Sequence, residues 1–183
     1  MQYKASIKKY FKNFQKLLNL SDHNLEKIND ICHLLKKLNK TNKKVLIFGN
    51  GGSASIASHV SVDLIKIAKI KCVNFNEANL ITCFSNDYGY ENWMKKSLEV
   101  HAEKNDVLII ISSSGESQNV INLANQGKKM GLKKIITLTG FQKSNRLRKK
   151  GDINIWIDSK MYNFVENTHQ LILLSIVDLI SKT

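Results

Sequence analysis

The chain has 183 residues, of which 43% are hydrophobic and 23% charged. These values are typical of a folded domain and exclude a disordered chain. No apolar run approaches the roughly 18 residues of a membrane span, and MQYKASIKKYFKNF has no apolar signal core, so we expect a cytoplasmic protein with no membrane partner.

The formal net charge of +13 raises the possibility of a nucleic-acid partner. Arg146 and Arg148 are the only arginines, however, and the lysines are scattered from Lys4 to Lys182. Specific base recognition relies on arginine forks. We therefore interpret the charge as solvated surface that also attracts small anions, and a nucleic-acid partner is not expected. The three cysteines have no CxxC spacing, so neither a disulfide framework nor a zinc knuckle is predicted.

Apolar residues recur at helical spacing in residues 3–18 and again in residues 25–38. Ser21 and Asp22 offer a helix start between the two stretches. The pattern predicts two amphipathic helices in residues 1–40. Such a pair can act as an oligomerisation arm or pack on its own domain, and the pattern allows both.

From residue 45 onward, short apolar runs alternate with segments of helical spacing. The expected strands are 45–48, 72–75, 107–112, 135–140 and 153–157, and the expected helices are 53–68, 88–103, 117–130 and 163–181. Continuous apolar runs favour strands that are covered on both faces. The predicted fold is α/β, a three-layer sandwich with a five-stranded parallel sheet in residues 41–183 and a helical N-terminal arm.

The first expected strand runs into the glycine-rich turn GNGGS, residues 49–53. Glycines allow a tight turn and close approach of a ligand, and a helix N-terminus attracts anions. The spacing matches neither the dinucleotide fingerprint nor a P-loop, so no nucleotide cofactor is predicted. Taken alone, the turn is equally compatible with simple packing.

The third expected strand runs into SSSGES, residues 112–117. Hydroxyl and backbone N–H groups around one glycine can surround phosphate oxygens. The alternative, a helix N-cap, needs only Ser117 and leaves Ser112, Ser113 and Ser114 unexplained. Because ligands of open α/β sheets gather beyond the carboxyl ends of the strands, the two turns together predict a phosphate site.

Three further features carry candidate chemistry. In SNDYGYENW, residues 85–93, Asp87 belongs either to a capped turn or to a substrate wall where it accepts hydrogen bonds from sugar hydroxyls. His59 and Asp63 are four residues apart, and Glu166 and His169 are three apart, so each pair shares one helix face. Imidazole and carboxylate on two helices suit a divalent metal or an acid/base pair, although a single such pair is commonly a surface interaction.

The order of GNGGSASIASH, NDYGYE, SSSGES and VEN-H resembles the sugar isomerase (SIS) domain, and within it the phosphoheptose isomerases, over about residues 35–181. The resemblance implies a homotetramer that isomerises sedoheptulose 7-phosphate to a heptose 7-phosphate for lipopolysaccharide or capsule. It implies that the sugar phosphate is held by the serine-rich turn, with Asn50 and Ser53 lining the sugar site and Asp87 nearby. The phosphate residues implied are Ser112, Ser113, Ser114 and Ser117.

The resemblance also implies catalytic residues and a zinc ion or another divalent cation. The family has histidine and glutamate four apart on one helix, then glutamine and histidine eight apart on the last. Here these positions are occupied by His59, Asp63, Glu166 and Leu174. A related branch of SIS proteins carries aspartate and Glu-x-x-His there, which makes His169 a substitute for the missing imidazole.

On this basis, Asp63 or Glu166 is the expected base and His169 the expected acid. His59 is expected to bind the metal together with Asp63, Glu166 and His169. Because Leu174 can neither ligate a metal nor transfer a proton, two alternatives stay open. One is a non-catalytic adaptor that binds the replication initiator, and the other is a sugar-phosphate-sensing module.

Overall fold

Five apolar segments form one parallel sheet in the computed structural model, which describes residues 3–182. The strands are β1 (Val45–Gly49), β2 (Cys72–Asn74), β3 (Val107–Ser112), β4 (Lys134–Thr139) and β5 (Ile153–Trp156). Their order is β2-β1-β3-β4-β5, so the chain leaves β1 towards one edge and then returns to its other side. Gly49 lies opposite Ile111 in the β1–β3 register, which places the glycine turn and the serine turn side by side at this switch point.

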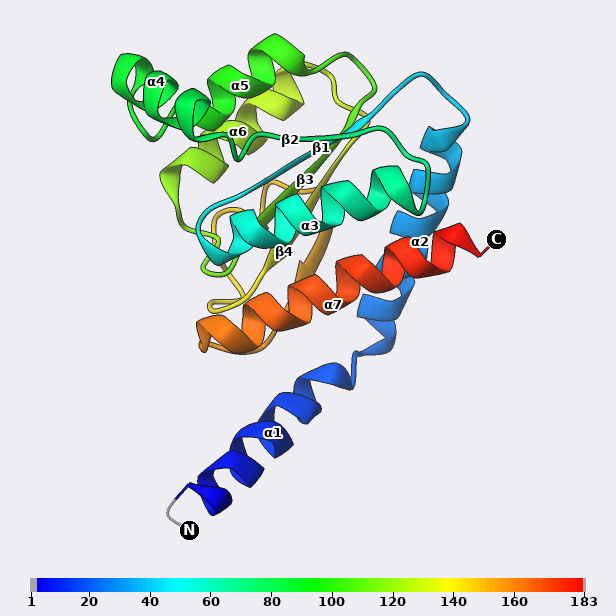
Figure 1. Cartoon of the computed structure of the whole chain (residues 1–183), viewed down its shortest axis with the longest axis vertical. Helices are drawn as coiled ribbons and strands as arrows, with labels where there is room; N and C mark the ends of the chain where they lie inside the picture. Colours follow the sequence, from blue (N-terminus) through cyan, green and yellow to red (C-terminus); the bar gives the residue numbers. More distant parts are fainter. Residues whose placement is uncertain (1–2, 183) are drawn as a thin grey trace.

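The helices are α1 (Lys4–Leu18), α2 (Asp22–Asn39), α3 (Gly52–Lys66), α4 (Ala78–Tyr88), α5 (Trp93–His101), α6 (Gln118–Lys129) and α7 (Tyr162–Ser181). Helices α2, α3 and α7 cover one face of the sheet, and α5 and α6 cover the other, with α4 beside α5 (Figure 1). This arrangement confirms the predicted three-layer α/β fold.

Alternate residues of each strand contribute to two separate cores. In β1, Val45 and Ile47 pack with α2, α3 and α7, whereas Leu46 and Phe48 pack with α5 and α6. All four are essentially inaccessible to solvent. Each side chain of this size contributes about 1.5–3 kcal/mol when fully buried. Burial on both faces therefore holds the strand ends from which the two turns start.

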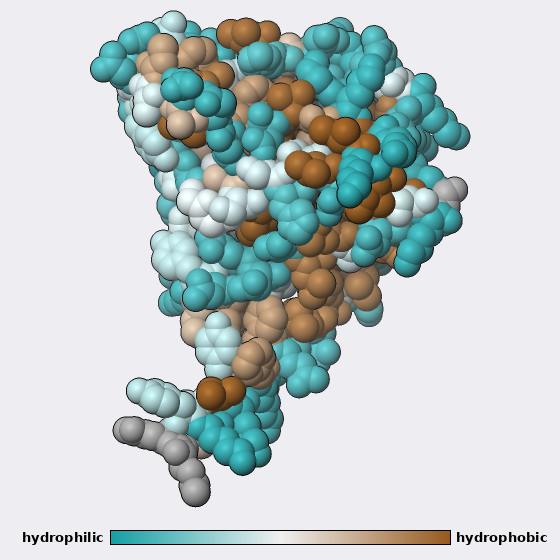
Figure 2. Space-filling view, in the orientation of Figure 1, coloured by the Kyte–Doolittle hydropathy of each residue, from teal (hydrophilic) through white to brown (hydrophobic). Residues whose placement is uncertain are grey.

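Helix α1 projects from the body of the molecule (Figure 1) and has no buried residues. Tyr10 and Phe14 contact Phe164 of α7, whereas Ile7 and Phe11 are more than half exposed. Figure 2 shows apolar surface on this helix and on the adjoining face of the body.

Helix α2, in contrast, buries one face against the sheet and α7. Its Ile31, Leu35 and Leu38 are inaccessible or nearly so. The sequence allowed residues 1–40 either to form an oligomerisation arm or to pack on their own domain, and α2 packs on its own domain. Only α1 stands out as an arm.

The sequence analysis missed helix α4 and started the next helix too early. The segment expected as a helix over 88–103 is interrupted at Gly89, whose φ of 82° ends α4, and α5 begins at Trp93. Helix α4 is capped by the Glu77 carboxylate, which accepts hydrogen bonds from the backbone N–H groups of Asn79 and Leu80. Between residues 3 and 182, no helix has the length and apolar character needed to cross a bilayer.

Candidate functional site

A pocket of about 100 Å³ lies at the switch point of the sheet, between the two turns and the start of α7. Its walls are formed by Asn50, Ser53, Ser112, Ser113, Ser114, Ser117, Tyr162 and Glu166. The structure thus brings together the six residues of the two turns that the sequence singled out for substrate binding, and adds Glu166 to them. Tyr162 was missed, although it lies four residues before Glu166 and so on the same face of α7.

Three helices begin at this pocket, and none has a side-chain cap. Helix α3 follows Gly51, α6 follows Ser117 and α7 follows Met161, and no capping side-chain hydrogen bond is made at any of these positions. Ser117 occupies the N-cap position, yet its hydroxyl does not cap α6. The simple N-cap interpretation therefore fails. Backbone N–H groups at three helix N-termini converge on the pocket, which suits an anion.

The serine turn is organised by its own hydroxyls. Ser112 Oγ accepts a hydrogen bond from the Gly115 N–H, and Ser114 Oγ accepts one from the Glu116 N–H, both at 3.3 Å. Gly115 has a φ of 68°, and a Cβ there would come within 2.2 Å of Asn145 Oδ1. The Leu147 N–H donates to Gly115 O at 2.9 Å. The turn is thus braced from behind and requires glycine at this position.

The glycine turn is fixed through Asn50. Its amide exchanges two hydrogen bonds of 3.0 Å with the amide of Asn119 in α6. The Tyr90 hydroxyl donates to Asn50 Oδ1 at 3.1 Å. Asn119 and Tyr90 were not identified from the sequence as site residues. Their contribution is to fix the orientation of an amide whose position the sequence did indicate.

The Glu166 carboxylate projects into the pocket at the N-terminal end of α3. Ser113 Oγ donates to Glu166 Oε1 at 3.4 Å. A Cβ on Gly52 would lie 2.4 Å from Glu166 Oε2, so glycine at position 52 leaves the room that the carboxylate occupies. The N-terminal end of α3, with its partial positive charge, therefore lies beside this carboxylate.

His59, on α3, lies between two partners, Asp63 of the same helix and Gln170 of α7. Its Nε2 is 3.3 Å from Asp63 Oδ2, and its Nδ1 is 3.2 Å from Gln170 Nε2. Because the amide nitrogen can only donate, Nδ1 accepts, and the ring proton on Nε2 points to Asp63. The sequence paired His59 with Asp63 and overlooked Gln170. A signal was available, since Gln170 follows Glu166 by four residues.

His169 does not face the pocket, which corrects the expectation that it replaces a missing catalytic imidazole. Its side chain is fully buried, and Nε2–H donates to Thr139 O at 3.2 Å. Nδ1 is buried without a hydrogen-bond partner among the described residues. Burial lowers the pKa of His169 to about 4, so the ring is neutral near pH 7. A neutral imidazole enclosed in the core supports the strand end and reaches neither substrate nor solvent.

Asp87 and Leu174 also lie outside the pocket. Asp87 lies in the last turn of α4 as an exposed residue and accepts hydrogen bonds from Asn86 Nδ2 and the Cys83 thiol. The chain described here does not bring it to the serine turn, so it forms no part of a substrate wall within one subunit. Leu174 is partly buried and packs against the core beneath α7.

The four expected metal ligands do not form one cluster. Among residues 3–182, no group of three or more histidine, cysteine, aspartate or glutamate side chains is arranged to hold a metal ion. His59 and Asp63 offer two donors, and both ring nitrogens of His59 already have partners. His169 is enclosed in the core. The residues of one chain therefore do not fit the zinc site that the sequence predicted.

Comparisons with known proteins identify the family of the chain. The family model of the SIS domain matches residues 9–140. The phosphoheptose isomerase of Sulfurimonas denitrificans is 30% identical over 98% of this chain and 93% of its own. That of Helicobacter pylori strain Shi470 is 32% identical over 96% and 94% of the two chains.

Solved structures show the same fold. The phosphoheptose isomerase of Francisella tularensis superposes with a TM-score of 0.89 at 23% identity, covering 100% of both chains. That of Neisseria gonorrhoeae gives a TM-score of 0.88 at 22% identity, covering 97% of this chain and 98% of its own. The sequence matches extend over nearly the full length of the chain, and the pocket is built from residues of the motifs that carried the resemblance. The chain therefore belongs to the SIS domain family, among the phosphoheptose isomerases.

Proposed function

We propose that the protein is an aldose–ketose isomerase that converts sedoheptulose 7-phosphate to a heptose 7-phosphate for surface polysaccharide synthesis. The names of the similar proteins support this substrate. The observation that carries the chemistry is the Glu166 carboxylate, held 3.4 Å from Ser113 in the pocket of the serine turn. A phosphate anchor and a carboxylate at one site are what the reaction needs.

The phosphate binds the serine hydroxyls and the N–H groups of the converging helices. Glu166 takes the proton from the carbon next to the carbonyl, and the electron pair forms the carbon–carbon double bond of a cis-enediol. The carbonyl oxygen gains a proton while the neighbouring hydroxyl later loses one. Glu166 then returns its proton to the former carbonyl carbon. His59, held at Nδ1 by Gln170, handles the oxygen-bound protons in place of His169 once its Nε2 leaves Asp63 for the substrate oxygen.

The test is turnover of sedoheptulose 7-phosphate by Glu166→Gln and by Glu99→Gln, a control in α5 that lies outside the pocket and pairs with Lys96. We expect kcat to fall about 100-fold or more in Glu166→Gln, because general-base catalysis contributes that much. The kcat of Glu99→Gln should be unchanged, and both variants should keep the affinity of the unmodified protein for the sugar phosphate. Full turnover by Glu166→Gln would remove Glu166 from the mechanism.

The same assay addresses the zinc prediction and the alternatives. Because one chain offers an incomplete set of ligands, we expect turnover to persist after treatment with a chelator; its complete loss, restored by zinc, would return the metal to the mechanism. The resemblance, which implies that Leu174 stands where the family has a histidine, keeps the sensing module as the second candidate. Tight binding of the sugar phosphate by the unmodified protein without any turnover would support sensing, and capture of a replication initiator without turnover would support the adaptor.

We also propose that the protein is a homotetramer assembled through α1. The support for this is physical: Ile7 and Phe11 are 53% and 63% exposed in a single chain, although the helix is strongly amphipathic in sequence. An apolar stripe of this kind is more stable against another apolar surface than in water.

A further inference from the structure

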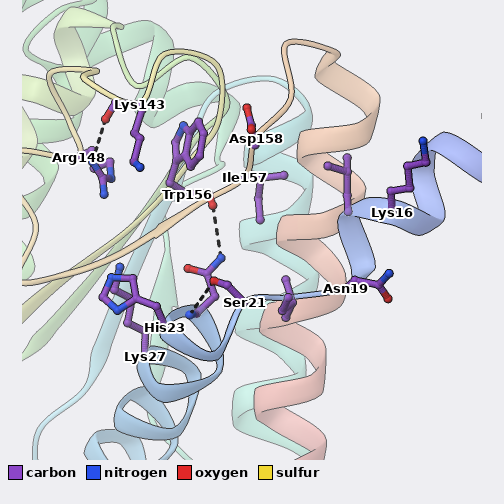
Figure 3. Close-up of a pocket in the computed structure, with 13 residues that line it drawn as sticks. Lys16, Asn19, Ser21, His23, Lys27, Lys143, Arg148, Trp156, Ile157 and Asp158 are labelled. Atoms are coloured by element: carbon purple, nitrogen blue, oxygen red, sulfur yellow. Dashed lines mark hydrogen bonds between the residues drawn. The ribbon is translucent and has the colours of Figure 1, made fainter.

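A cavity of about 330 Å³ lies away from the serine pocket, where the α1–α2 connection meets strand β5 and the segment after β4. It shares no lining residue with the serine pocket. Figure 3 shows its lining side chains. The volume falls within the range of about 300–1,000 Å³ that is usual for small-molecule sites.

The lining of this cavity is strongly cationic. Lys16, Lys27, Lys143 and Arg148 contribute four positive charges, and Asp158 is the single carboxylate. In Figure 3, Lys143 and Arg148 approach from the segment after β4, and Lys27 approaches from α2 on the opposite side. Helix α2 also begins here, directly after its N-cap Ser21, and adds the partial positive charge of its N-terminus.

These cations are held by neutral groups rather than by acids. Lys27 Nζ donates to Asn154 O at 2.6 Å, and Arg148 Nη1 donates to Lys143 O at 2.9 Å. Lys143 Nζ lies 5.7 Å from the centre of the Trp156 ring. None of the ion pairs found within residues 3–182 includes any of the four. Arg148 Nε is buried without a hydrogen-bond partner in the same part of the chain.

The proximity of Lys27 and Arg148 is unfavourable without an anion. Burial, together with the charge of Arg148, lowers the pKa of Lys27. Like charges that converge on a partly enclosed cavity without acidic partners are stabilised by a negatively charged ligand. A single phosphate carries about −1.5 to −2 charges near pH 7, so two are needed to match the excess of cations here.

We propose that this cavity binds a small molecule with a diphosphate group or two phosphate groups, no larger than a nucleoside diphosphate. The ligand would lie between Lys143 and Arg148 on one side and Lys27 on the other. The site is independent of the isomerase reaction, because none of its side chains lines the serine pocket.

The test is calorimetric titration of the full chain with inorganic pyrophosphate, at constant ionic strength, in a Ser113→Ala/Ser114→Ala background that weakens the other phosphate site. We expect about one equivalent of pyrophosphate to bind, more tightly than inorganic phosphate. Lys143→Ala should weaken the affinity about tenfold, the usual effect of losing a charged hydrogen-bonding partner. Lys143 is exposed, so this variant should fold, which its thermal unfolding midpoint will check.

The matched control is Lys104→Ala, which removes an exposed lysine from the turn before β3. Its affinity for pyrophosphate should equal that of the unmodified protein. An equal loss in Lys104→Ala and Lys143→Ala would overturn the proposal, because binding would then reflect the overall charge. Failure of pyrophosphate to bind would also overturn it, as would an RNA oligonucleotide that binds more tightly through the same lysine.

Discussion

At the scale of single residues, the contact between Gln170 and His59 was not apparent from the sequence, and we expect it to affect the rate of the reaction. Its amide holds His59 Nδ1, so that the Nε2 proton is directed to Asp63. Gln170→Leu should lower kcat about tenfold through loss of one hydrogen bond near the reacting atoms, with little change in KM because the phosphate contacts remain.

The control for this change is Asn167→Leu on the same helix. Asn167 is exposed, and its side chain bonds only locally to Asn163 O. Steady-state kinetics of both variants will separate a positioning effect from a general effect on α7. Equal losses in the two variants would contradict a role for Gln170 in positioning His59.

The buried imidazole of His169 should also make the stability of the folded protein depend on pH. The unfolded chain takes up its proton near the ordinary pKa of 6.5, whereas the folded protein takes it up near 4. Above pH 6.5, His169 does not contribute to the pH dependence of the free energy of unfolding. Between pH 6.5 and 4 the unfolded state binds more protons, so stability falls as pH falls, by up to about 3 kcal/mol.

Urea unfolding between pH 7 and 4.5 will measure this loss. His169→Gln should be less stable than the unmodified protein at pH 7, because it loses the fit around the ring, but it should show a shallower decline with acid. Parallel declines for the two proteins would mean that other groups control the acid sensitivity.

At the scale of elements, the serine turn depends on the segment behind it. Gly115→Ala would direct a methyl group into Asn145, whereas Gly131→Ala, at the same φ of 68°, meets only Lys104 Cγ at 3.8 Å. Both changes impose the strain of a left-handed backbone, about 1 kcal/mol. Only Gly115→Ala should also displace the turn, raising KM for the sugar phosphate and lowering the unfolding midpoint further. Equal effects of the two changes on KM would show that the packing of Asn145 behind the serine turn does not matter for substrate binding.

The elements also show what could be predicted from sequence and what could not. The strands were predictable because each is a continuous apolar run, and the pocket was predictable because both turns follow neighbouring strands. Helix α4 was missed because its cap is a glutamate, an uncommon N-cap residue. His169 was misassigned because spacing shows which residues are neighbours on a helix surface but not which of them face the pocket. Glu166 points to the pocket, whereas His169, three residues later, points to Thr139.

At the scale of the whole molecule, α1 should control assembly. Ile7→Asp with Phe11→Asp should dissociate the proposed tetramer, because each change places a carboxylate on the apolar stripe. The separated chains should remain folded, since neither side chain is buried in its own chain. Light scattering after size-exclusion chromatography will measure this, with Lys12→Asp on the same helix as control. One unchanged mass for all variants would exclude α1 as the assembly surface.

The contact between α2 and β5 has a consequence for how copies of the chain can meet. Strand β5 is at the edge of the sheet, where an uncovered backbone can pair with a strand of another molecule. Lys27 and Asn24 of α2 donate to the carbonyls of Asn154 and Trp156 on this edge. A neighbouring strand would have to break these bonds and displace a helix. The β5 edge of the sheet is thereby protected from edge-to-edge aggregation, and association at this end of the sheet is directed to helical surfaces.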